Sequence, residues 1–281
     1  GSIDFIKLDL KEVTILDQIF KEKKFASIIH FSASLIVPES IEDPLKYYTN
    51  NVINSINLIN CAVKYNVKKF IFSSTAAVYG DIDPKKMPVT EKYPTNPTTP
   101  YGSSKLMIEK VLDDTSKANK NFKFVVLRYF NVAGSDVDGL IGQSTLNSTH
   151  LIKVAAQTAL GKRKSIGIFG SDYDTKDGTC IRDFIHVCDL ANAHIKSLDY
   201  LNKNNSDIFN CGYGSGYTVL ELVNTMKEVS NVNFNAQMDA RREGDIIVMI
   251  ADNYKIKSKM DWTPKFNDLE LICKNTLDWE K

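Results

Sequence analysis

Short apolar runs alternate with amphipathic segments along the first half of the chain. Ile28–Phe31 and Phe70–Ser74 have the length and composition of buried strands, and Phe124–Phe130 is a third β-rich run. Strands separated by helical patterns indicate βαβ units and a parallel sheet. The pattern therefore predicts an α/β fold built on a doubly wound parallel sheet.

Two helices are predicted between these strands. One begins at Pro44, with Asp43 as its N-cap. Its apolar stripe consists of Leu45, Tyr48, Val52, Ile56 and Ile59. The other begins at Tyr101, after a proline-rich loop that runs from Asp81 to Pro100. The helix that begins at Tyr101 would cover the strand end formed by Ser73, Ser74 and Thr75.

The second half of the chain has a different composition. Residues 133–183 are richer in Gly, Asp, Thr and Ser and contain one helical pattern, around Leu151–Leu160. Phe184–Val187 and Ile208–Cys211 are apolar again, and we expect both to return to the sheet. The sequence therefore predicts a smaller second domain inserted around later sheet elements, which makes both domains discontinuous.

A glycine-rich segment follows the last of these runs. Gly212–Gly216 has the pattern Gly-x-Gly-x-Gly, not Gly-x-Gly-x-x-Gly. Thr218 and Glu221 have the spacing of a capping box, which explains the start of a helix without a phosphate ligand. We interpret the segment as a turn.

Composition narrows the possible partners. The chain has 281 residues, of which 25% are charged, and a formal net charge of +1. This gives no reason to expect nucleic acid or an anionic membrane as a partner. No apolar run approaches the ~20 residues of a membrane span. The five cysteines include no Cys-x-x-Cys, so we expect a reducing, cytoplasmic environment. The four histidines lack metal-ligand spacing, and no metal site is expected.

Candidate chemistry lies where a predicted strand ends and a predicted helix begins. Ser73–Thr75 end the strand, and Tyr101 and Lys105 are four residues apart, which places both side chains on one helix face. A nearby ammonium favours the phenolate and lowers the pKa of a tyrosine from about 10. Tyr101 could then act as the general base for a hydroxyl that is being oxidised, with Thr75 as a neighbouring hydrogen-bond donor.

This spacing is weak evidence by itself, because Tyr65 and Lys69 repeat it. That second pair lies at the N-terminal edge of the predicted sheet, whereas ligands of open α/β sheets bind outside the carboxyl ends of the strands. We therefore interpret Tyr65 as a structural residue and Tyr101 as the candidate. The pattern indicates alcohol–ketone redox chemistry of the short-chain dehydrogenase type.

Further motifs occur in order from Asp9 to Trp279, nearly the whole chain. They are His30-Phe31, Pro38-Glu-Ser40, Tyr47-Tyr-Thr-Asn-Asn51, Arg128-Tyr-Phe-Asn131, Ile168-Phe-Gly170, Asp177-Gly-Thr179, Arg182-Asp-Phe-Ile-His186 and Arg241-Arg-Glu-Gly-Asp245. Together with the Tyr–Lys helix, they make the chain resemble the NAD-dependent UDP-sugar 4-epimerases of the extended short-chain dehydrogenase/reductase family.

The resemblance implies NAD as the cofactor and an interconversion of UDP-glucose and UDP-galactose through a 4-keto intermediate. Tyr101 would remove the proton of the sugar 4-hydroxyl while hydride passes from C4 to NAD. The intermediate would turn over and receive the hydride on its opposite face. Lys105 would lower the pKa of Tyr101 and hold the nicotinamide ribose, and Thr75 would hydrogen-bond the reacting oxygen.

The resemblance also implies two sets of binding residues. The cofactor would contact Asp9, Leu10, Phe31, Ser32, Ala33, Asn50, Ser73, Tyr101, Lys105 and Tyr129. The UDP-sugar would contact Thr75, Asn131, His150, Leu151, Phe169, Arg182, Arg242, Asp245 and Met249. Of these, Arg182 and Arg242 would clamp the pyrophosphate, because a guanidinium fork matches phosphate oxygens. Asp245 would bind the UDP ribose.

Domains and assembly follow from the same resemblance. Residues 1–132 with about 181–212 would form the NAD-binding Rossmann-like domain, and 133–180 with about 213–281 the UDP-sugar domain. A homodimer is expected through the helices beginning at Pro44 and Tyr101. A Rossmann domain opens with a strand, a glycine-rich turn and a helix, so about 50 residues should precede Asp9. We therefore expect the first βαβ unit to be missing from this sequence, and Gly1-Ser2 to be either native or an expression remnant.

Related chemistries remain as alternatives. NDP-sugar 4,6-dehydratases place acidic residues just after the strand-end threonine, because dehydration needs a proton donor and a base. Ala76 and Ala77 stand there in this chain and disfavour dehydration. Another NAD-dependent nucleotide-sugar epimerase, or a non-catalytic homologue that binds NAD or a UDP-sugar, stays open.

Two positions differ among family members. Leu35 stands where some carry a lysine that touches NAD. Met249 matches the position that limits the pocket around the sugar C2 substituent, which is tyrosine in narrow-specificity members. A flexible methionine leaves UDP-glucose and UDP-N-acetylglucosamine both open as substrates. We expect at least some activity on the N-acetyl pair.

Overall fold

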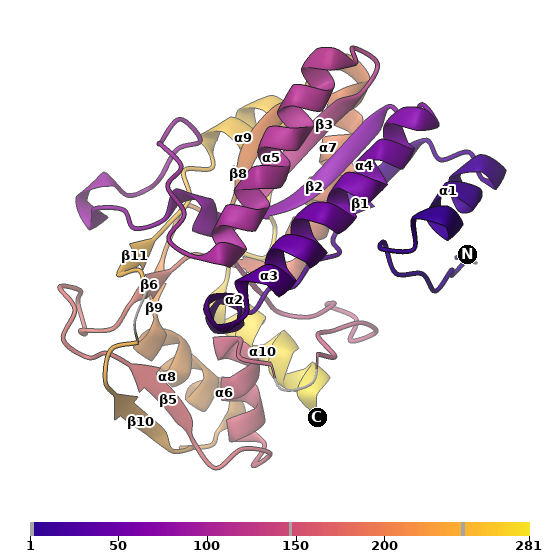
Figure 1. Cartoon of the computed structure of the whole chain (residues 1–281). Coiled ribbons are helices and arrows are strands. Elements are labelled where there is room, and N and C mark those ends of the chain that lie inside the picture. The colour runs from indigo at the N-terminus through magenta and orange to yellow at the C-terminus, as the bar shows by residue number, and fades with distance from the viewer. Residues whose placement is uncertain (1–2, 146–147, 243–244) are drawn as a thin grey trace. The chain divides into compact units, whose positions relative to one another are not determined.

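The computed structural model describes residues 3–145, 148–242 and 245–281 (Figure 1). Gly1 and Ser2, and Glu243 and Gly244 of the second arginine motif, lie outside the described residues. The chain divides into two compact units, each built from several segments. The first comprises Gly1–Val78, Thr95–Leu127 and Ser197–Ile208, and the second Tyr79–Pro94, Arg128–Lys196 and Phe209–Lys281.

The first unit is an α/β layer. Its helical segments are α1 (Val13–Glu22), α2 (Val37–Glu42), α3 (Pro44–Tyr47), the π-helix η1 (Tyr48–Ile53), α4 (Asn54–Lys64) and α5 (Pro100–Ala118). The strands β1 (Ser27–His30), β2 (Lys69–Thr75), β3 (Lys123–Tyr129) and β8 (Asp207–Cys211) form a sheet in the order β1-β2-β3-β8. β1 and β2 are parallel, with Ser27 opposite Lys69. The predicted α/β class with a parallel sheet is confirmed.

Helices α4 and α5 run side by side along the sheet (Figure 1). The buried side chains between helices and sheet include Leu58, Ile59, Phe70, Phe72, Ile108, Leu112, Phe124 and Val126. Each fully buried side chain of this kind contributes about 1.5–3 kcal/mol relative to an exposed one. This packing fixes the end of β2 relative to the first turn of α5, where the candidate chemistry lies.

The helix predicted from Pro44 begins there, and Asp43 accepts a hydrogen bond from the backbone N–H of Lys46 (3.2 Å), as an N-cap does. The predicted apolar stripe is wrong at its start, because Leu45 is exposed and Tyr47 is fully buried. The π-helix η1 follows directly. Its wider turns change the angular spacing of side chains, which an apolar period of 3.6 residues does not reveal.

The second unit combines short sheets with a group of packed helices. Its helices are α6 (Leu151–Ala159), α8 (Val219–Ser230), α9 (Tyr254–Met260) and α10 (Leu269–Glu280), with α6, α8 and α10 in mutual contact. Its strands pair as β4 (Asn131–Ala133) with β7 (Phe184–His186), β5 (Ile166–Phe169) with β10 (Ala236–Asp239), and β6 (Ile181–Arg182) with both β9 (Tyr217–Thr218) and β11 (Val248–Met249). The remaining elements are α7 (Val187–Lys203) and the 3₁₀ turns η2 (Ala76–Tyr79) and η3 (Pro84–Lys86).

Most of the predicted elements of the second half are confirmed. The helix around Leu151 forms, Thr218 and Glu221 make both hydrogen bonds of a capping box, and β8 joins the main sheet. The prediction for residues 184–187 is wrong, because β7 pairs with β4, Asn131 opposite Phe184. The partner strand β4 belongs to the segment that directly follows β3, and β4 and β7 form a separate two-stranded sheet. Residues 181–196 also belong to the second compact unit. The division into an NAD-binding and a UDP-sugar-binding domain stays a prediction.

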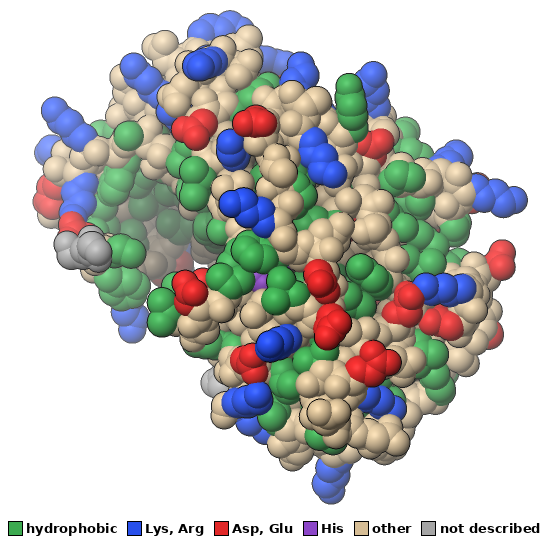
Figure 2. Space-filling view, turned by 180° about the vertical axis from the view of Figure 1, so that it is seen from behind, with side chains coloured by type: hydrophobic (Ala, Val, Ile, Leu, Met, Phe, Trp, Pro, Cys, Tyr) green, Lys and Arg blue, Asp and Glu red, His purple; other side chains and the backbone are tan. Residues whose placement is uncertain are grey.

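Charges of both signs are interspersed on the molecular face shown in Figure 2, as the net charge of +1 leads one to expect. All five cysteines are free thiols, and four of them are buried. Within residues 3–145, 148–242 and 245–281, no helix combines the length and the apolar character needed to cross a membrane.

Candidate active site

The start of α5 is pressed against the chain that follows β2. Thr99 caps the helix by accepting a hydrogen bond from the N–H of Gly102 (3.2 Å), and Pro100 occupies the first helical position. A Cβ atom on Gly102 would lie 2.7 Å from the carbonyl oxygen of Ala77. A glycine is therefore needed for this close approach, which brings Tyr101 to the end of β2.

Thr75, Tyr101 and Lys105 meet at this place within the first unit. The side chains of Thr75 and Tyr101 are hydrogen-bonded. The Tyr101 ring also packs edge-on against Tyr47, with ring centroids 6.4 Å apart. Burial raises the pKa of Tyr101, and the hydrogen bond with Thr75 opposes that change. The pKa of Tyr101 is thus raised and not lowered as predicted, because removal from water penalises the phenolate.

Lys105 is 3% exposed and contacts β2 near the carboxyl end of the strand. Its ammonium donates a hydrogen bond to the Ser73 carbonyl (2.8 Å) and lies 5.0 Å from the centroid of the Phe72 ring. Burial lowers the pKa of Lys105 to about 8, and the negative charge of Glu109 acts in the opposite direction. Near neutral pH a buried cation therefore lies against the carboxyl end of β2.

A buried pair of a carboxylate and a hydroxyl group lies one helix turn beyond Lys105 along α5. Glu109 is 3% exposed, and its carboxylate accepts a hydrogen bond from the hydroxyl of Ser74 (2.5 Å). Sequence reasoning missed both residues. The available signal was the spacing Tyr101-x-x-x-Lys105-x-x-x-Glu109, which continues the same helix face.

Asn51, in the π-helix, connects the loop after β1 to α5. Its side chain accepts a hydrogen bond from the N–H of Ser34 (2.7 Å) and donates to the Ser34 carbonyl (3.0 Å) and to the Ser104 hydroxyl (3.0 Å). Ser104 in turn donates to the Tyr101 carbonyl (2.8 Å). Sequence reasoning selected the neighbouring Asn50 and missed Asn51, because only the turn geometry of η1 distinguishes the two.

A groove of about 540 Å³ lies beside this network in the first unit and is lined mainly by polar residues, including Asp9, Lys11, Ser34, Asn50 and Asn54. The Asn50 amide donates to the Ser34 hydroxyl (2.9 Å). Carboxylate, amide and hydroxyl groups of this kind are suited to the amino group and ribose hydroxyls of a dinucleotide. The donor set therefore fits part of NAD.

Three other predicted cofactor residues follow the carboxyl end of β1, and two lie in the segment before α1. Phe31 is 59% exposed directly after β1, followed by Ser32 and Ala33 in the same loop. Leu10 accepts a hydrogen bond at its carbonyl from the Asn57 amide (3.2 Å). The Asp9 carboxylate accepts from the Lys11 N–H (3.0 Å), so it also acts as a local turn cap.

Five predicted substrate residues meet in the second unit. The Arg242 guanidinium donates to the Asp245 carboxylate (2.8 Å) and lies 5.0 Å from the centroid of the Phe169 ring. Arg182 reaches the same carboxylate at 4.0 Å. Met249 faces Arg182 across the β11–β6 pairing and is buried. Two guanidinium groups, one carboxylate and one exposed ring form a site suited to a nucleotide with phosphate groups.

The remaining predicted residues of this unit make their contacts elsewhere. Tyr129, at the end of β3, hydrogen-bonds to His194. Asn131 begins β4 with an exposed side chain, and its N–H donates to the Asp183 carbonyl (2.9 Å). His150 and Leu151 stand at the N-terminus of α6. The predicted residues therefore fall into separate groups, some in the first unit and some in the second.

Tyr65 and Lys69, which repeat the Tyr–Lys spacing, have structural contacts. The Tyr65 ring packs near Phe20, with centroids 6.1 Å apart. The Lys69 ammonium donates to the Leu198 carbonyl (3.3 Å) and to the Asn202 side chain (2.5 Å). Lys69 begins β2 at the amino end of the strand, away from Thr75 at the carboxyl end. The interpretation of this pair as structural agrees with these contacts.

The chain is similar to known proteins in sequence and in structure. The model of the NAD dependent epimerase/dehydratase family matches residues 1–212. A UDP-glucose 4-epimerase of Azospirillum brasilense is 44% identical over 100% of this chain and 80% of that protein. The structure of the UDP-Glc/GlcNAc 4-epimerase from Campylobacter jejuni is 52% identical with a TM-score of 0.86, covering 99% of this chain and 84% of that one. The UDP-glucose 4-epimerase from Bifidobacterium longum in complex with NAD+ and UDP is 35% identical with a TM-score of 0.94, covering 100% and 83%.

Proposed function

The chain belongs to the NAD dependent epimerase/dehydratase family, and we propose on this basis that it is a UDP-sugar 4-epimerase that interconverts UDP-glucose and UDP-galactose. The observation that carries the proposal is the meeting of Thr75, Tyr101 and Lys105 at the carboxyl end of β2. That arrangement provides a base, a hydrogen-bond partner and a buried cation for one sugar hydroxyl.

When bound, NAD would accept a hydride from the sugar C4 and return it. The chain's own residues handle the proton. Tyr101 takes the proton of the 4-hydroxyl at its phenolic oxygen, and the Thr75 hydroxyl, already hydrogen-bonded to Tyr101, holds the reacting oxygen in place. The Lys105 ammonium favours the ionised form of Tyr101, because opposite charges attract more strongly in a buried site.

The cofactor would be held by residues of the first unit. Asp9 and Asn50 line the polar groove, and Lys105 projects from the first turns of α5. The nucleotide part of the substrate would be held by Arg182, Arg242 and Asp245, with the guanidinium groups on the pyrophosphate and the carboxylate on the ribose.

Substrate breadth is the finer part of the proposal. Met249 is buried opposite Arg182 in the pairing of β11 with β6. An unbranched methionine adapts its shape to neighbouring groups better than a rigid ring does. The Campylobacter jejuni relative is named for both UDP-glucose and UDP-N-acetylglucosamine. We therefore include the N-acetyl pair among the substrates.

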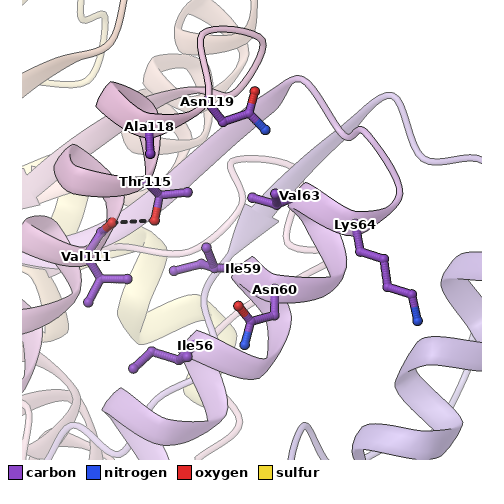
Figure 3. A pocket seen from close by; sticks show the side chains of 9 residues that line it. All are labelled: Ile56, Ile59, Asn60, Val63, Lys64, Val111, Thr115, Ala118 and Asn119. Atoms are coloured by element: carbon purple, nitrogen blue, oxygen red, sulfur yellow. Dashed lines mark hydrogen bonds between the residues drawn. The ribbon is translucent and has the colours of Figure 1, made fainter.

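A homodimer through α5 and the continuous helical segment that begins at Pro44, formed by α3, η1 and α4, is also part of the proposal. These helices border a groove of about 510 Å³ whose lining includes the apolar Ile56, Ile59, Val63 and Val111 (Figure 3). Further apolar side chains on the same helical segments are exposed, namely Ile53 and Met107. A second copy of the chain that presents the same two helices would bury this surface.

The domain roles and location follow the sequence prediction. We assign NAD binding to residues 1–132 with about 181–212, and UDP-sugar binding to 133–180 with about 213–281. The free thiols of all five cysteines support a cytoplasmic location, where cysteines stay reduced.

The direct test is to incubate the purified protein with UDP-galactose and added NAD and to follow the sugar by proton NMR. The proposal expects UDP-glucose to accumulate to a fixed ratio with UDP-galactose. A 4-keto-6-deoxy sugar would identify a dehydratase instead. Binding of UDP without any conversion, measured by calorimetry with NAD present, would identify a non-catalytic homologue and contradict the proposal.

A further inference from the structure

Glu109 is a buried acid beside the catalytic lysine that the mechanism above does not use. Resting on the proposed function, we propose that Glu109 is a positioning residue, which holds the end of β2 on α5 and supplies the negative charge that keeps Lys105 protonated. Neither Glu109 nor its partner Ser74 contacts the reacting oxygen in this proposal. Both act through Lys105 and Thr75.

The positioning part rests on two contacts of α5 with consecutive residues of β2. The Lys105 ammonium donates to the Ser73 carbonyl (2.8 Å), and the Glu109 carboxylate accepts from the Ser74 hydroxyl (2.5 Å). Lys105 and Glu109 are one helix turn apart, so the two contacts resist both sliding and rotation of the strand end. Thr75 is the next residue, and its position relative to α5 is thereby fixed.

The electrostatic part rests on burial and on the groups around the Lys105 ammonium. Lys105 and Glu109 are each 3% exposed, so water screens their interaction only weakly. The carboxylate opposes the loss of the Lys105 proton that burial promotes. On β2, the facing groups are the Phe72 ring and the Ser73 carbonyl, which carry no net charge.

Two titratable groups face Lys105 besides Glu109. Tyr101 lies on the same helix, four residues before it. His30 lies on β1, and burial together with the charge of Lys105 lowers the pKa of His30 to about 3. His30 is therefore neutral at working pH and adds no positive charge. The adjacent η1 and α4 contribute the buried Asn51 and Ser55, which do not titrate. Glu109 is thus the acid that acts on Lys105.

The experiment separates the charge from the hydrogen bond. Glu109→Gln keeps an oxygen that can accept from Ser74 but removes the charge, whereas Ser74→Ala removes the hydrogen bond and leaves the carboxylate. Lysine labelled with ¹³C at Cε reports the protonation of Lys105 by NMR in the protein without substrate, with Lys105→Met to assign the signal. Asp114→Asn is the matched control, because Asp114 is an exposed acid on the same helix, paired with Lys110.

The proposal expects Lys105 to lose its proton at lower pH in the Glu109→Gln protein than in the wild type. At pH 9 kcat then falls about tenfold for each pH unit of that change, with KM nearly constant. Ser74→Ala should leave the Lys105 titration in place and still lower kcat, and Asp114→Asn should change neither. Lys105 titrating identically in the wild type and Glu109→Gln would show a purely structural anchor and overturn the proposal.

The NMR titration needs no turnover, so it is read independently of the epimerase assay. A wild-type protein that does not convert UDP-galactose contradicts the proposed function but leaves the titration result to decide the role of Glu109. Should Glu109→Gln not fold, Ser74→Ala decides. If the kcat of Ser74→Ala equals that of the wild type, the proposal is overturned. A lower kcat with unchanged KM and an unchanged thermal unfolding midpoint supports it.

Discussion

Thr75 and Tyr101 are hydrogen-bonded through their side chains, although one ends β2 and the other opens α5. The contact depends on the absence of a side chain at Gly102, where a Cβ would lie 2.7 Å from the Ala77 carbonyl oxygen. The proposed base, Tyr101, is therefore already in contact with Thr75, the group proposed to orient the sugar hydroxyl. Catalysis does not need a rearrangement to bring them together.

Replacement of Tyr101 by phenylalanine should abolish most of the activity. Phenylalanine keeps the ring that packs on Tyr47 but removes the hydroxyl that takes the proton. We expect kcat for UDP-galactose to fall by about 10²–10⁴-fold, the usual contribution of a general base. UDP binding should not change, because the residues proposed to bind UDP, Arg182 and Arg242, belong to the second unit and do not include Tyr101. A coupled assay for UDP-glucose and calorimetry with UDP measure the two quantities.

Tyr65→Phe is the matched control for that variant. Tyr65 has the same spacing to a lysine, but its ring packs near Phe20, and Lys69 donates to Leu198 and Asn202. Its kcat should equal that of the wild type. Near-normal turnover by Tyr101→Phe would remove the basis of the proposed mechanism.

Arg242→Lys should weaken the binding of UDP although the charge is kept. The Arg242 guanidinium forms a fork that reaches Asp245 with two nitrogens (2.8 and 3.3 Å) and also lies over Phe169. A lysine ammonium cannot reproduce either geometry. Loss of one charge-assisted hydrogen bond, about 1.5–3 kcal/mol, corresponds to a rise in the UDP dissociation constant of about 10–100-fold. Isothermal titration calorimetry measures it.

The neighbouring Arg241 offers the control for this experiment. Its guanidinium is held by the Asp172 carboxylate (2.7 Å) and lies over the Tyr173 ring. Arg241→Lys should therefore change the UDP dissociation constant much less than Arg242→Lys. Equal effects of the two substitutions would show that the arginines act only through general charge, against the predicted clamp.

The sequence predicted what depends on local pattern. The apolar runs 28–31, 70–74 and 124–130 predicted the strands that the structure has at residues 27–30, 69–75 and 123–129, within one residue at each end, and the cap predicted the helix start at Pro44. The stripe after Pro44 was wrong because the π-helix changes the spacing of side chains, and no apolar period reports a π turn. The partner of β7 was also wrong, since pairing depends on which edge the chain presents.

In the candidate site, too, the sequence predicted local features and missed those that depend on contacts between elements. The spacing of Tyr101 and Lys105 predicted that both belong to one helix, because side chains four residues apart share a helix face, and their catalytic role stays a prediction. The carboxylate of Glu109 was missed, since its importance appears only when Ser74 of another element is seen beside it. The pKa of Tyr101 was predicted in the wrong direction for the chain by itself, because burial cannot be read from spacing.

His30 should make the protein sensitive to acid. Burial lowers the pKa of His30 from 6.5 to about 3, and its ring hydrogen-bonds to Ser55 (2.7 Å). The unfolded chain therefore binds a proton between pH 6.5 and pH 3 that the folded chain does not. The resulting stability is complete above pH 6.5 and is lost as the pH falls toward 3.

The variant His30→Gln tests whether the titration of His30 causes this loss of stability at low pH. Glutamine can hydrogen-bond to Ser55 but does not titrate, so its free energy of unfolding should fall less between pH 7 and pH 4.5 than that of the wild type. The difference should approach about 2–3 kcal/mol, since each pH unit contributes about 1.4 kcal/mol. Urea unfolding at the two pH values measures it. Parallel losses in both proteins would show that other groups control the acid sensitivity.

Met107→Glu should disrupt the proposed homodimer. Met107 is exposed on α5, the helix that contributes Val111 to the apolar groove. A second copy would have to bury the new carboxylate without a partner, which costs several kcal/mol. We expect light scattering to report a dimer for the wild type and a monomer for the variant. Asp114→Asn, on the same helix, should remain dimeric. A monomeric wild type would contradict the assembly.

Met249→Tyr should narrow the substrate range. Met249 is buried in β11, opposite Arg182 of the arginine site. A rigid tyrosine ring would occupy space that the thioether chain can vacate, so an added N-acetyl group would meet it. A pocket contact with one small group typically changes kcat/KM between two substrates by about 10–200-fold. We expect turnover of UDP-N-acetylgalactosamine to fall by that factor while turnover of UDP-galactose changes little. Met249→Leu, which stays flexible and similar in volume, should keep both activities. A wild-type protein without measurable N-acetyl turnover would sink the prediction, because Met249 would then not be the residue that leaves the pocket open.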